Sequence, residues 1–212
     1  MDFIHPLANE YAAQYSNATP PYLKEVYEST LAAHPHAYMQ SSWTQGGFLS
    51  LISKLLQPKY ILELGTFSGF SAMCLAEGLE NDGQLHTLEL REPDGINAQN
   101  NINQSPYKDK IKIHVGDASE TLQHLTAPWD IVFIDADKVN YGKYYQMIFP
   151  YVKKNGLIIA DNVLFHGEVF SETLKGKNAK AIHAFNEMIV SDQLADTVLL
   201  TVRDGLSLIR KK

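Results

Sequence analysis

The stretch Tyr60–Ser71, which reads YILELGTFSGFS, constrains the fold more than any other part of the chain. A mainly apolar run that carries one acid, Glu63, leads into a turn containing Gly65 and Gly69, and a helical pattern follows at once. A strand, a glycine turn and a helix in this order are typical of the first unit of a nucleotide-binding α/β sheet. The two glycines predict a tight turn whose backbone a ligand can approach closely.

The spacing within this turn indicates which ligand it suits. A dinucleotide-binding turn reads G-x-G-x-x-G and holds a pyrophosphate at the helix N-terminus. This chain reads E-x-G-x-x-x-G-x-S, so the middle glycine is missing and an acid stands two residues before the first glycine. A carboxylate repels phosphate but attracts a cationic amine, and S-adenosylmethionine has such an amine, a ribose and no phosphate. A generic strand-to-helix turn with a surface acid explains this stretch alone equally well.

Short apolar runs recur along the rest of the chain, with helical stretches near 70–80, 93–103, 118–124 and 140–152 between them. This alternation is typical of a parallel sheet that helices cover on both faces. Near the end, two apolar runs flank Arg203-Asp204-Gly205, and Asp-Gly between such runs is a hairpin signal. We therefore expect an α/β fold with five parallel strands and a C-terminal antiparallel pair, seven strands in all. The expected strands are Tyr60–Leu64, Leu85–Leu90, Ile111–Val115, Ile131–Ile134, Leu157–Ala160, Thr197–Val202 and Leu206–Ile209.

Helical patterns also precede the first strand, over residues 2–16, 22–33 and 44–56, with Thr19 as a candidate N-cap of the second helix. The three helices either form a cap or only pack on the sheet or on a partner chain, and the pattern does not separate these possibilities. We expect one domain over residues 1–212, in which 1–58 form a helical N-terminal cap and 59–212 the cofactor-binding α/β core.

The composition argues against several classes of protein. The formal net charge of -6 gives no basic footprint for nucleic acid. The single cysteine, Cys74, excludes an intramolecular disulfide framework. No stretch approaches the roughly 20 apolar residues of a transmembrane helix, and the N-terminus lacks the basic-then-apolar order of a signal peptide. We expect a soluble, cytoplasmic protein that binds neither nucleic acid nor membrane.

Polar residues follow the expected strands at the edge where ligands bind in such a sheet. Glu89 ends the second strand, about 20 residues past the glycine turn, where an acid suits the hydroxyls of a ribose. The alternative is a solvated acid at the edge of the sheet. After the third strand, Gly116-Asp117-Ala118 can border an adenine ring, although Asp117 can equally be only the cap of the next helix.

Two acids and an amide follow the fourth and fifth strands. Asp135 comes directly after Ile134, and Asp161-Asn162 come directly after Ala160. Because neighbouring parallel strands lie about 4.8 Å apart, these side chains can converge. Their hard oxygen atoms favour Mg²⁺, Mn²⁺ or Ca²⁺ over zinc. The alternative is that each acid only caps its own loop.

Further candidates lie in the loops after these strands. Lys138, three residues past Asp135, is a candidate general base, or else an exposed loop lysine. His166 either lines a substrate pocket or is solvated. On the next helix, the tyrosines at 141, 144 and 145 either wall the site or pack the helix on the sheet.

Taken in order, the segments ILELGTFSGFSA, TLEL, GDA, FIDADKxxYxxYY, GLIIADNV and DGLSLIRKK resemble the cation-dependent O-methyltransferases. This family includes the catechol and caffeoyl-coenzyme A enzymes and many bacterial small-molecule relatives. The resemblance runs from about Met39 to the C-terminus, and the first 38 residues match only loosely. It implies the three-layer, Rossmann-like fold of class I methyltransferases.

The resemblance also implies a role for each matching position. The implied S-adenosylmethionine contacts are Ser41, Glu63, Gly65, Thr66, Ser71, Glu89, Ala118, Asp135, Asp137 and Tyr144. The implied ligands of a divalent cation, with Mg²⁺ placed before Mn²⁺ and Ca²⁺, are Asp135, Asp161 and Asn162. Asp135 and Lys138 are the implied catalytic residues, with Lys138 as the base, and Lys138 and His166 are the implied substrate contacts. Plant relatives carry asparagine in place of His166, so a preference for acyl-coenzyme A is not supported.

We therefore expect an enzyme that uses S-adenosylmethionine and a divalent cation to methylate one hydroxyl of a vicinal dihydroxy aromatic compound. The resemblance also implies a homodimer, since relatives usually are. Two alternatives stay open, a non-catalytic sensor of S-adenosylmethionine and a nicotinamide-dependent oxidoreductase, although Glu63 and the missing glycine count against the latter. The acceptor itself is not predicted, because substrate choice in this architecture lies in the loops and the N-terminal segment.

Overall fold

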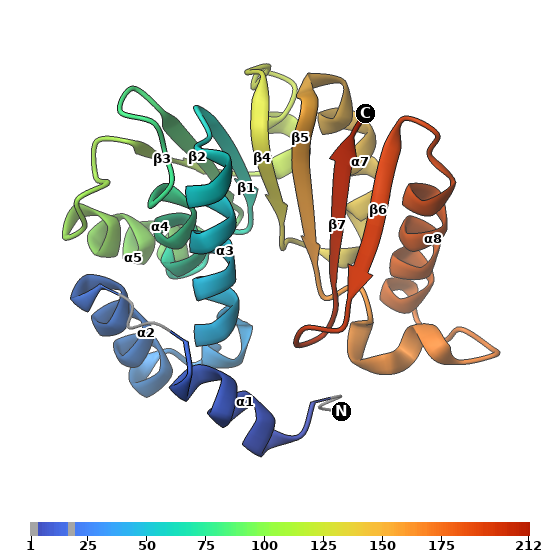
Figure 1. Cartoon of the computed structure of the whole chain (residues 1–212), viewed down its shortest axis with the longest axis horizontal. Coiled ribbons are helices and arrows are strands. Elements are labelled where there is room, and N and C mark those ends of the chain that lie inside the picture. Colours follow the sequence, from blue (N-terminus) through green and yellow to red (C-terminus); the bar gives the residue numbers. More distant parts are fainter. Residues whose placement is uncertain (1–3, 17–19) are drawn as a thin grey trace.

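A single mixed sheet runs through the computed structural model, which describes residues 4–16 and 20–212 (Figure 1). Within these residues the sheet has seven strands in the order β3-β2-β1-β4-β5-β7-β6. The strands are β1 (Tyr60–Leu64), β2 (Gln84–Glu89), β3 (Ile111–Val115), β4 (Trp129–Ile134), β5 (Val152–Asp161), β6 (Ala195–Leu200) and β7 (Leu206–Lys211). The pairs among β1 to β5 are parallel, and β7 pairs antiparallel with β5 and β6. The predicted fold class is therefore confirmed.

Helices cover both faces of this sheet, so the molecule has three layers (Figure 1). The α-helices are α1 (Pro6–Gln14), α2 (Pro21–Ala33), α3 (Trp43–Leu56), α4 (Phe70–Ala76), α5 (Glu92–Asn103), α6 (Ala118–Thr121), α7 (Tyr141–Ile148) and α8 (Lys177–Ser191). Short 3₁₀ turns are η1 (Ala37–Met39), η2 (Lys138–Asn140), η3 (Phe149–Tyr151) and η4 (Phe165–Phe170). None of the helices in the described residues is long and apolar enough to cross a bilayer.

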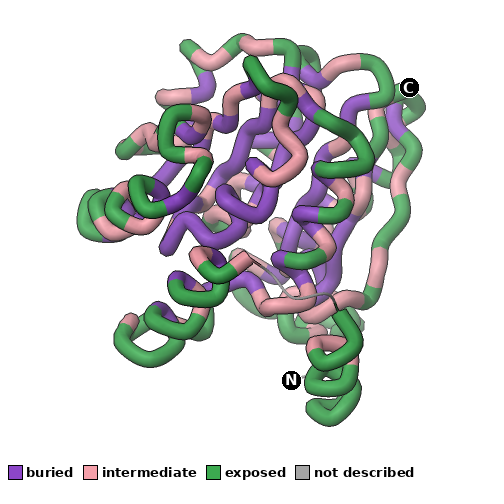
Figure 2. Tube along the Cα trace, turned by 60° about the vertical axis from the view of Figure 1, so that its left-hand side comes forward, coloured by how far each residue is buried: buried purple, intermediate pink, exposed green. Residues whose placement is uncertain are grey.

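Alternating side chains of the strands build a separate apolar core on each face. In β1, Ile61 packs into the core beneath α3, α4 and α5, whereas Leu62 and Leu64 pack into the core beneath α7 and α8. Successive residues of a strand point to opposite faces, so a strand covered on both sides is apolar throughout. Figure 2 shows the buried trace concentrated in the sheet and in the helices that pack directly on it. This burial on both faces explains why apolar runs in the sequence were sufficient to predict where the parallel strands lie.

The three N-terminal helices are attached to very different degrees. Leu49 of α3 and Leu23 of α2 are fully buried in the same core as α4. In contrast, α1 has no buried residue and projects from the body of the molecule (Figures 1 and 2). Thus α2 and α3 pack on the fold, and the segment Tyr38–Ser41 between them lines the cavity described below.

Several predicted boundaries were wrong by a few residues. The helix predicted over 140–152 ends at Ile148, because Pro150 follows and the chain tightens into η3. The strand predicted over Thr197–Val202 ends at Leu200, so residues 201–205 join the last two strands, with Arg203 and Gly205 both at positive φ. The predicted cap Thr19 lies outside the described residues, and the described N-cap of α2 is Pro20, which has no side-chain hydrogen bond.

Candidate functional site

A cavity of about 650 Å³ lies at the carboxyl ends of the parallel strands. The loops after β1 to β5 all contribute to its wall, as expected for a sheet of this type. The segment Tyr38–Ser41, Ile4 and Asn9 near the N-terminus, and the turn residues Arg203 and Asp204 add to the lining. Its volume falls within the range of about 300–1,000 Å³ that is usual for small-molecule sites.

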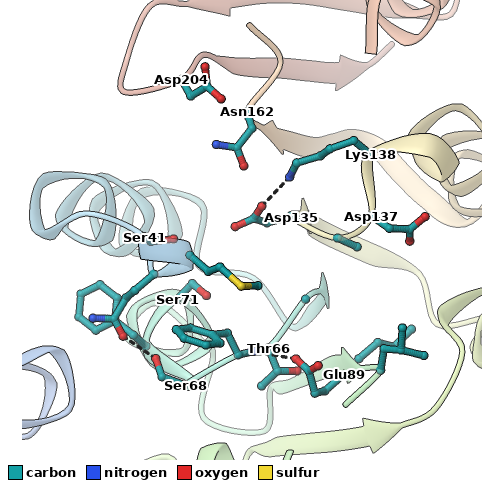
Figure 3. Close-up of a pocket in the computed structure, with 18 of the residues that line it drawn as sticks. Ser41, Thr66, Ser68, Ser71, Glu89, Asp135, Asp137, Lys138, Asn162 and Asp204 are labelled. Atoms are coloured by element: carbon teal, nitrogen blue, oxygen red, sulfur yellow. Dashed lines mark hydrogen bonds and ion pairs between the residues drawn. The ribbon is translucent and has the colours of Figure 1, made fainter. Parts of the chain in front are cut away.

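Most of the residues predicted for the site line this one cavity. They are Ser41, Gly65, Thr66, Ser71, Glu89, Ala118, Asp135, Asp137, Lys138, Tyr144, Asn162 and His166. Figure 3 shows Asp135, Lys138 and Asn162 gathered toward one end, and Thr66 and Glu89 toward the other. Two predicted residues, Glu63 and Asp161, are fully buried behind the wall instead.

The turn after β1 depends on a glycine at its first position. Gly65 has φ of +100°, and a Cβ atom there would lie 2.1 Å from the carbonyl oxygen of Asp135. Only glycine allows the ends of β1 and β4 to approach this closely. The turn thus brings its own backbone and the loop carrying Asp135 to the same cavity.

Glu63 lies under this turn and connects to the cavity through two threonines. Its Oε2 accepts a hydrogen bond of 2.5 Å from Thr87 Oγ1, which in turn lies 2.6 Å from Thr66 Oγ1. Since Thr87 has one hydroxyl proton, Thr66 donates to Thr87 and Thr87 donates to Glu63. Burial raises the pKa of the Glu63 carboxyl to about 8, and its Oε1 has no hydrogen-bond partner among the described residues. Burial makes the ionised form of Glu63 costly, so a cationic group bound in the adjoining turn would stabilise that form.

Backbone groups hold Glu89 at the end of β2. Its Oε2 accepts a hydrogen bond from Phe67 N at 2.8 Å and its Oε1 accepts one from Arg91 N at 2.9 Å. Each carboxylate oxygen keeps a further lone pair, so Glu89 can still accept hydrogen bonds from two ligand hydroxyls. This geometry suits the adjacent hydroxyls of a ribose.

Asp117 and Asp137 border the cavity near α6 and α7. Asp117 caps α6, because its Oδ1 accepts hydrogen bonds from Ser119 N at 2.7 Å and Glu120 N at 3.2 Å. Asp137 Oδ1 accepts a hydrogen bond of 2.5 Å from Tyr144 Oη. Asp117 thus caps α6 and also lines the cavity, and Tyr144 both packs α7 and lines the cavity.

The three residues predicted as cation ligands occupy one corner of the site. Asp135 and Asn162 line the cavity, while Asp161 lies behind them with no exposed surface. Asp161 Oδ2 accepts a hydrogen bond of 2.8 Å from Gln45 Nε2, and its Oδ1 accepts one of 2.7 Å from Asn162 N. Burial raises the pKa of Asp161 above its ordinary value, and the Asp135 carboxylate adds to the shift.

The protein offers a mixed set of oxygen ligands at this corner. The described residues contain no group of three or more His, Cys, Asp or Glu side chains able to hold a metal ion. A cation bound here would therefore depend on the amide oxygen of Asn162 beside the two carboxylates. Asn162 has φ of +57°, a left-handed conformation that asparagine tolerates better than most residues.

Lys138 is tied into the same corner. Its Nζ donates hydrogen bonds to Asp135 Oδ1 at 2.9 Å and to Tyr141 Oη at 2.7 Å. Burial alone lowers the pKa of Lys138, but the Asp135 carboxylate and Tyr141 outweigh it and raise that pKa above its ordinary value. When Asp135 is ionised and no cation shares its charge, Lys138 is therefore an ammonium group rather than a base.

His166 stands at the rim, with 64% of its side chain exposed. Its backbone N donates a hydrogen bond of 2.7 Å to Asp204 Oδ1, and its ring Nδ1 lies 3.6 Å from Asp204 Oδ2. Leu164 N also donates to the Asp204 carbonyl, at 2.9 Å. The turn between β6 and β7 thus holds the loop that carries His166.

Sequence reasoning missed three groups in the site wall, which are Arg203-Asp204, the segment Tyr38–Gln40, and Ile4 with Asn9. Arg203 NH1 donates to Gln45 Oε1 and its NH2 donates to the Tyr38 carbonyl, both at 3.2 Å. These contacts join the C-terminal turn to the N-terminal segment. The Asp-Gly pair signalled only a hairpin, and no local pattern indicated that this hairpin reaches the site.

Comparisons with known proteins match this chain to O-methyltransferases. A family model described as O-methyltransferase matches residues 13–212. The catechol O-methyltransferase of Niastella koreensis is 35% identical over 173 residues, which is 77% of this chain and 78% of that protein. Probable caffeoyl-CoA O-methyltransferase 2 of Dictyostelium discoideum is 30% identical over 207 residues, 95% of this chain and 90% of that protein. The structure of the O-methyltransferase from Bacillus cereus in complex with SAH superposes with a TM-score of 0.90, at 30% identity and over 97% of both chains.

Proposed function

The chain belongs to the O-methyltransferase family, and from this premise we propose that it methylates one hydroxyl of a vicinal dihydroxy aromatic small molecule. The methyl donor is S-adenosylmethionine and a divalent cation assists. The observation that carries this function is one cavity lined at one end by Glu89 and at the other by Asp135, Lys138 and Asn162. It offers room for a nucleoside cofactor beside an acceptor held by oxygen ligands and a lysine.

Three features of the wall fit S-adenosylmethionine. Glu89 has lone pairs to spare for ribose hydroxyls, and Gly65 leaves the turn backbone open. Glu63 has a buried oxygen without a donor beneath that turn, which a cationic amine nearby would stabilise. The Bacillus cereus relative holds SAH, the demethylated form of this cofactor, in a chain of the same fold.

The oxygen atoms at the other end fit a divalent cation. Asp135, Asp161 and Asn162 would hold it, because two carboxylates and an amide are the hard ligands that Mg²⁺ prefers, with Mn²⁺ and Ca²⁺ as alternatives. Bound there, a cation supplies Lewis acidity that lowers the pKa of an acceptor hydroxyl. The buried Asp161 keeps free lone pairs beside its bonds from Gln45 and Asn162.

Within this scheme the protein's own residues orient the acceptor and move its proton. Lys138 accepts the proton of the attacking hydroxyl at Nζ, a role that requires the charge of Asp135 to be shared with a cation. The cavity holds donor and acceptor in one geometry, and such alignment is worth about 7–11 kcal/mol of a barrier. His166 and Arg203 border the acceptor end, where the choice of acceptor is made.

Methyl transfer tests the function directly. Labelled S-adenosylmethionine is incubated with catechol or caffeic acid in the presence of Mg²⁺, then with EDTA, then with Mg²⁺ restored. We expect transfer that EDTA abolishes and Mg²⁺ restores. Transfer that persists in EDTA would contradict the cation site. Cofactor binding in calorimetry without transfer to any catechol would favour the sensor alternative, and tight nicotinamide binding would revive the oxidoreductase.

A homodimer is part of the same proposal. On α1, Leu7, Tyr11 and Tyr15 expose apolar side chains at successive helical turns, and the two tyrosine rings stack with centroids 4.3 Å apart. Leu51 and Leu55 of α3 are exposed as well. An apolar surface of this kind favours a second copy as its cover. Light scattering of wild-type protein and a Tyr11→Ser variant tests it, with dimer expected for the first and monomer for the second.

No nucleic acid or membrane takes part in the proposed reaction, and the proposed location is the cytoplasm. The net charge of -6 supports the first point, and a free, buried Cys74 agrees with a reducing compartment. Cell fractionation followed by immunoblotting tests the location.

A further inference from the structure

We propose that Tyr141 is a positioning residue that fixes the amine of Lys138 within the acceptor end of the cavity. Tyr141 is fully buried, and its hydroxyl lies 2.7 Å from Lys138 Nζ. It has this role only if Lys138 takes the acceptor proton, as proposed above. Tyr141 itself does not line the cavity, so it acts through the lysine rather than on the acceptor.

The direction of each hydrogen bond follows from the groups involved. Tyr141 Oη lies 3.1 Å from the carbonyl oxygen of Ile134 and 3.0 Å from that of Asp161. Both carbonyls only accept, so they share the single hydroxyl proton of Tyr141. The lone pair of Oη therefore accepts a hydrogen bond from Lys138 Nζ.

This arrangement anchors a flexible side chain to rigid parts of the fold. Ile134 ends β4 and Asp161 ends β5, so the hydroxyl ties Nζ to the ends of two paired strands. The ring of Tyr141 is itself held edge-to-face against Phe185 of α8, with centroids 5.5 Å apart. Lysine has four rotatable bonds, and a fixed partner removes most of the conformations in which Nζ misses the acceptor.

Two hydrogen-bond partners also limit which position of Lys138 Nζ is left for the acceptor. Its ammonium group has three donors, of which Asp135 Oδ1 takes one and Tyr141 Oη takes another. In the neutral amine that acts as the base, Nζ keeps two N–H bonds for these partners and one lone pair for a proton from an acceptor in the cavity that Lys138 lines. In the proposed reaction the Asp135 carboxylate would bind a divalent cation. Tyr141 would then be the partner that keeps Nζ in place.

The chain offers a matched control on the same helix. Tyr145 lies one turn after Tyr141, is almost as buried, and packs on the same Phe185. Its hydroxyl donates to Asp192 Oδ2 at 2.7 Å, away from the cavity. Tyr145→Phe therefore removes the same buried hydroxyl from the same helix without touching Lys138.

The first experiment compares Tyr141→Phe with Tyr145→Phe in the full chain. We expect kcat of Tyr141→Phe to fall about 10-fold, the loss that corresponds to one hydrogen bond to a charged group, with KM for S-adenosylmethionine unchanged. Tyr145→Phe should keep kcat within twofold of the wild-type value. We expect the melting temperatures of the two variants to fall by similar amounts. Equal kcat values for the two variants would overturn the positioning role.

A double-mutant cycle asks whether Tyr141 acts through Lys138. Adding Tyr141→Phe to Lys138→Ala should lower kcat no further, because the group that Tyr141 positions is already gone. The same 10-fold loss in both backgrounds would show that Tyr141 does not act through Lys138. If Lys138→Ala alone leaves kcat unchanged, the proposed role of the lysine fails instead, and that outcome is separate.

A spectroscopic measurement tests the contact without any turnover. In ¹H–¹⁵N spectra of lysine amines, the signal that disappears in Lys138→Ala belongs to Lys138. We expect Tyr141→Phe to shift or broaden this signal and Tyr145→Phe to leave it unchanged. A signal that Tyr141→Phe does not alter would overturn the inference, even in a protein that transfers no methyl group to the acceptors tested.

Discussion

Gln45 Nε2 donates a hydrogen bond of 2.8 Å to Asp161 Oδ2, which joins α3 to the end of β5. Gln45 and Asp161 both have no exposed surface. Arg203 NH1 extends the contact, since it donates to Gln45 Oε1 at 3.2 Å and lies 3.8 Å from the same Asp161 oxygen. A helix that precedes the sheet and a turn that follows it thus meet on one buried carboxylate of the site.

Gln45→Leu should therefore destabilise the protein by about 1–3 kcal/mol, the cost of leaving a buried polar group without its partner. The measurement is the free energy of unfolding in urea. Gln104→Leu is the control, because Gln104 is exposed at the end of α5. A stability loss no larger than that of the control would show that Asp161 does not depend on Gln45.

Gly65→Ala should disturb the turn on which the cofactor end depends. A Cβ atom would fall 2.1 Å from the Asp135 carbonyl oxygen, and the φ of +100° is strained for any L residue. We expect a loss of about 1–3 kcal/mol in unfolding free energy and at least a tenfold weaker binding of S-adenosylmethionine by calorimetry.

Gly47→Ala provides the opposite control. Gly47 is exposed in α3, and a Cβ atom there meets nothing within 4 Å. Alanine in a helix is more favourable than glycine by roughly 0.5–1 kcal/mol, so this variant should gain stability and bind the cofactor normally. If both alanine variants bind S-adenosylmethionine equally well, cofactor binding does not depend on the close approach of the two backbones at Gly65.

Glu63 predicts how the stability of the cofactor-free protein depends on pH. Burial raises its pKa from 4.5 to about 8, so the folded state binds a proton that the unfolded state releases between these values. The contribution to stability is present below pH 4.5 and is lost as the pH rises toward 8. Glu63→Gln keeps an acceptor for Thr87 and should remove this part of the pH dependence, as measured by urea unfolding from pH 5 to 9. The same slope in both proteins would contradict the raised pKa.

The parallel part of the fold could be predicted because its strands are buried on both faces. An uninterrupted apolar run such as Ile131–Ile134 reports that burial directly, whereas the ends of helices depend on single residues such as Pro150. The family resemblance is confirmed and extends further than predicted, since the family model starts at residue 13 rather than near Met39.

The site could be predicted only where it follows the strands in sequence. Asp135 and Asn162 stand at the ends of β4 and β5, so their position follows from the order of the elements. Arg203 and Gln45 come together across 158 residues, and no local pattern reports such a contact. Glu63 carried a usable signal, because strand alternation puts it on the same face as Ile61, inside the core rather than at the rim.

Asp135→Asn should weaken binding of Mg²⁺ or Mn²⁺ while the fold is kept. The side chain keeps its size but loses the charge that a cation and Lys138 both use. Calorimetric titration of the cofactor-loaded protein with each metal is the measurement, and the melting temperature is the check on folding. An affinity equal to that of the wild type would remove Asp135 from the cation site.

Lys138→Ala should lower kcat by about 10²–10⁴-fold, the usual contribution of a positioned general base. The affinity for S-adenosylmethionine should change little, because Lys138 contacts Asp135 and Tyr141 at the acceptor end. Lys143→Ala is the matched control, since Lys143 lies exposed on α7, does not line the cavity and carries the same charge. Transfer rates with catechol and cofactor binding are measured for both variants. A kcat for Lys138→Ala that equals the kcat of Lys143→Ala would exclude the base role, whereas a loss of cofactor affinity alone would move Lys138 from the chemistry to the binding of the methyl donor.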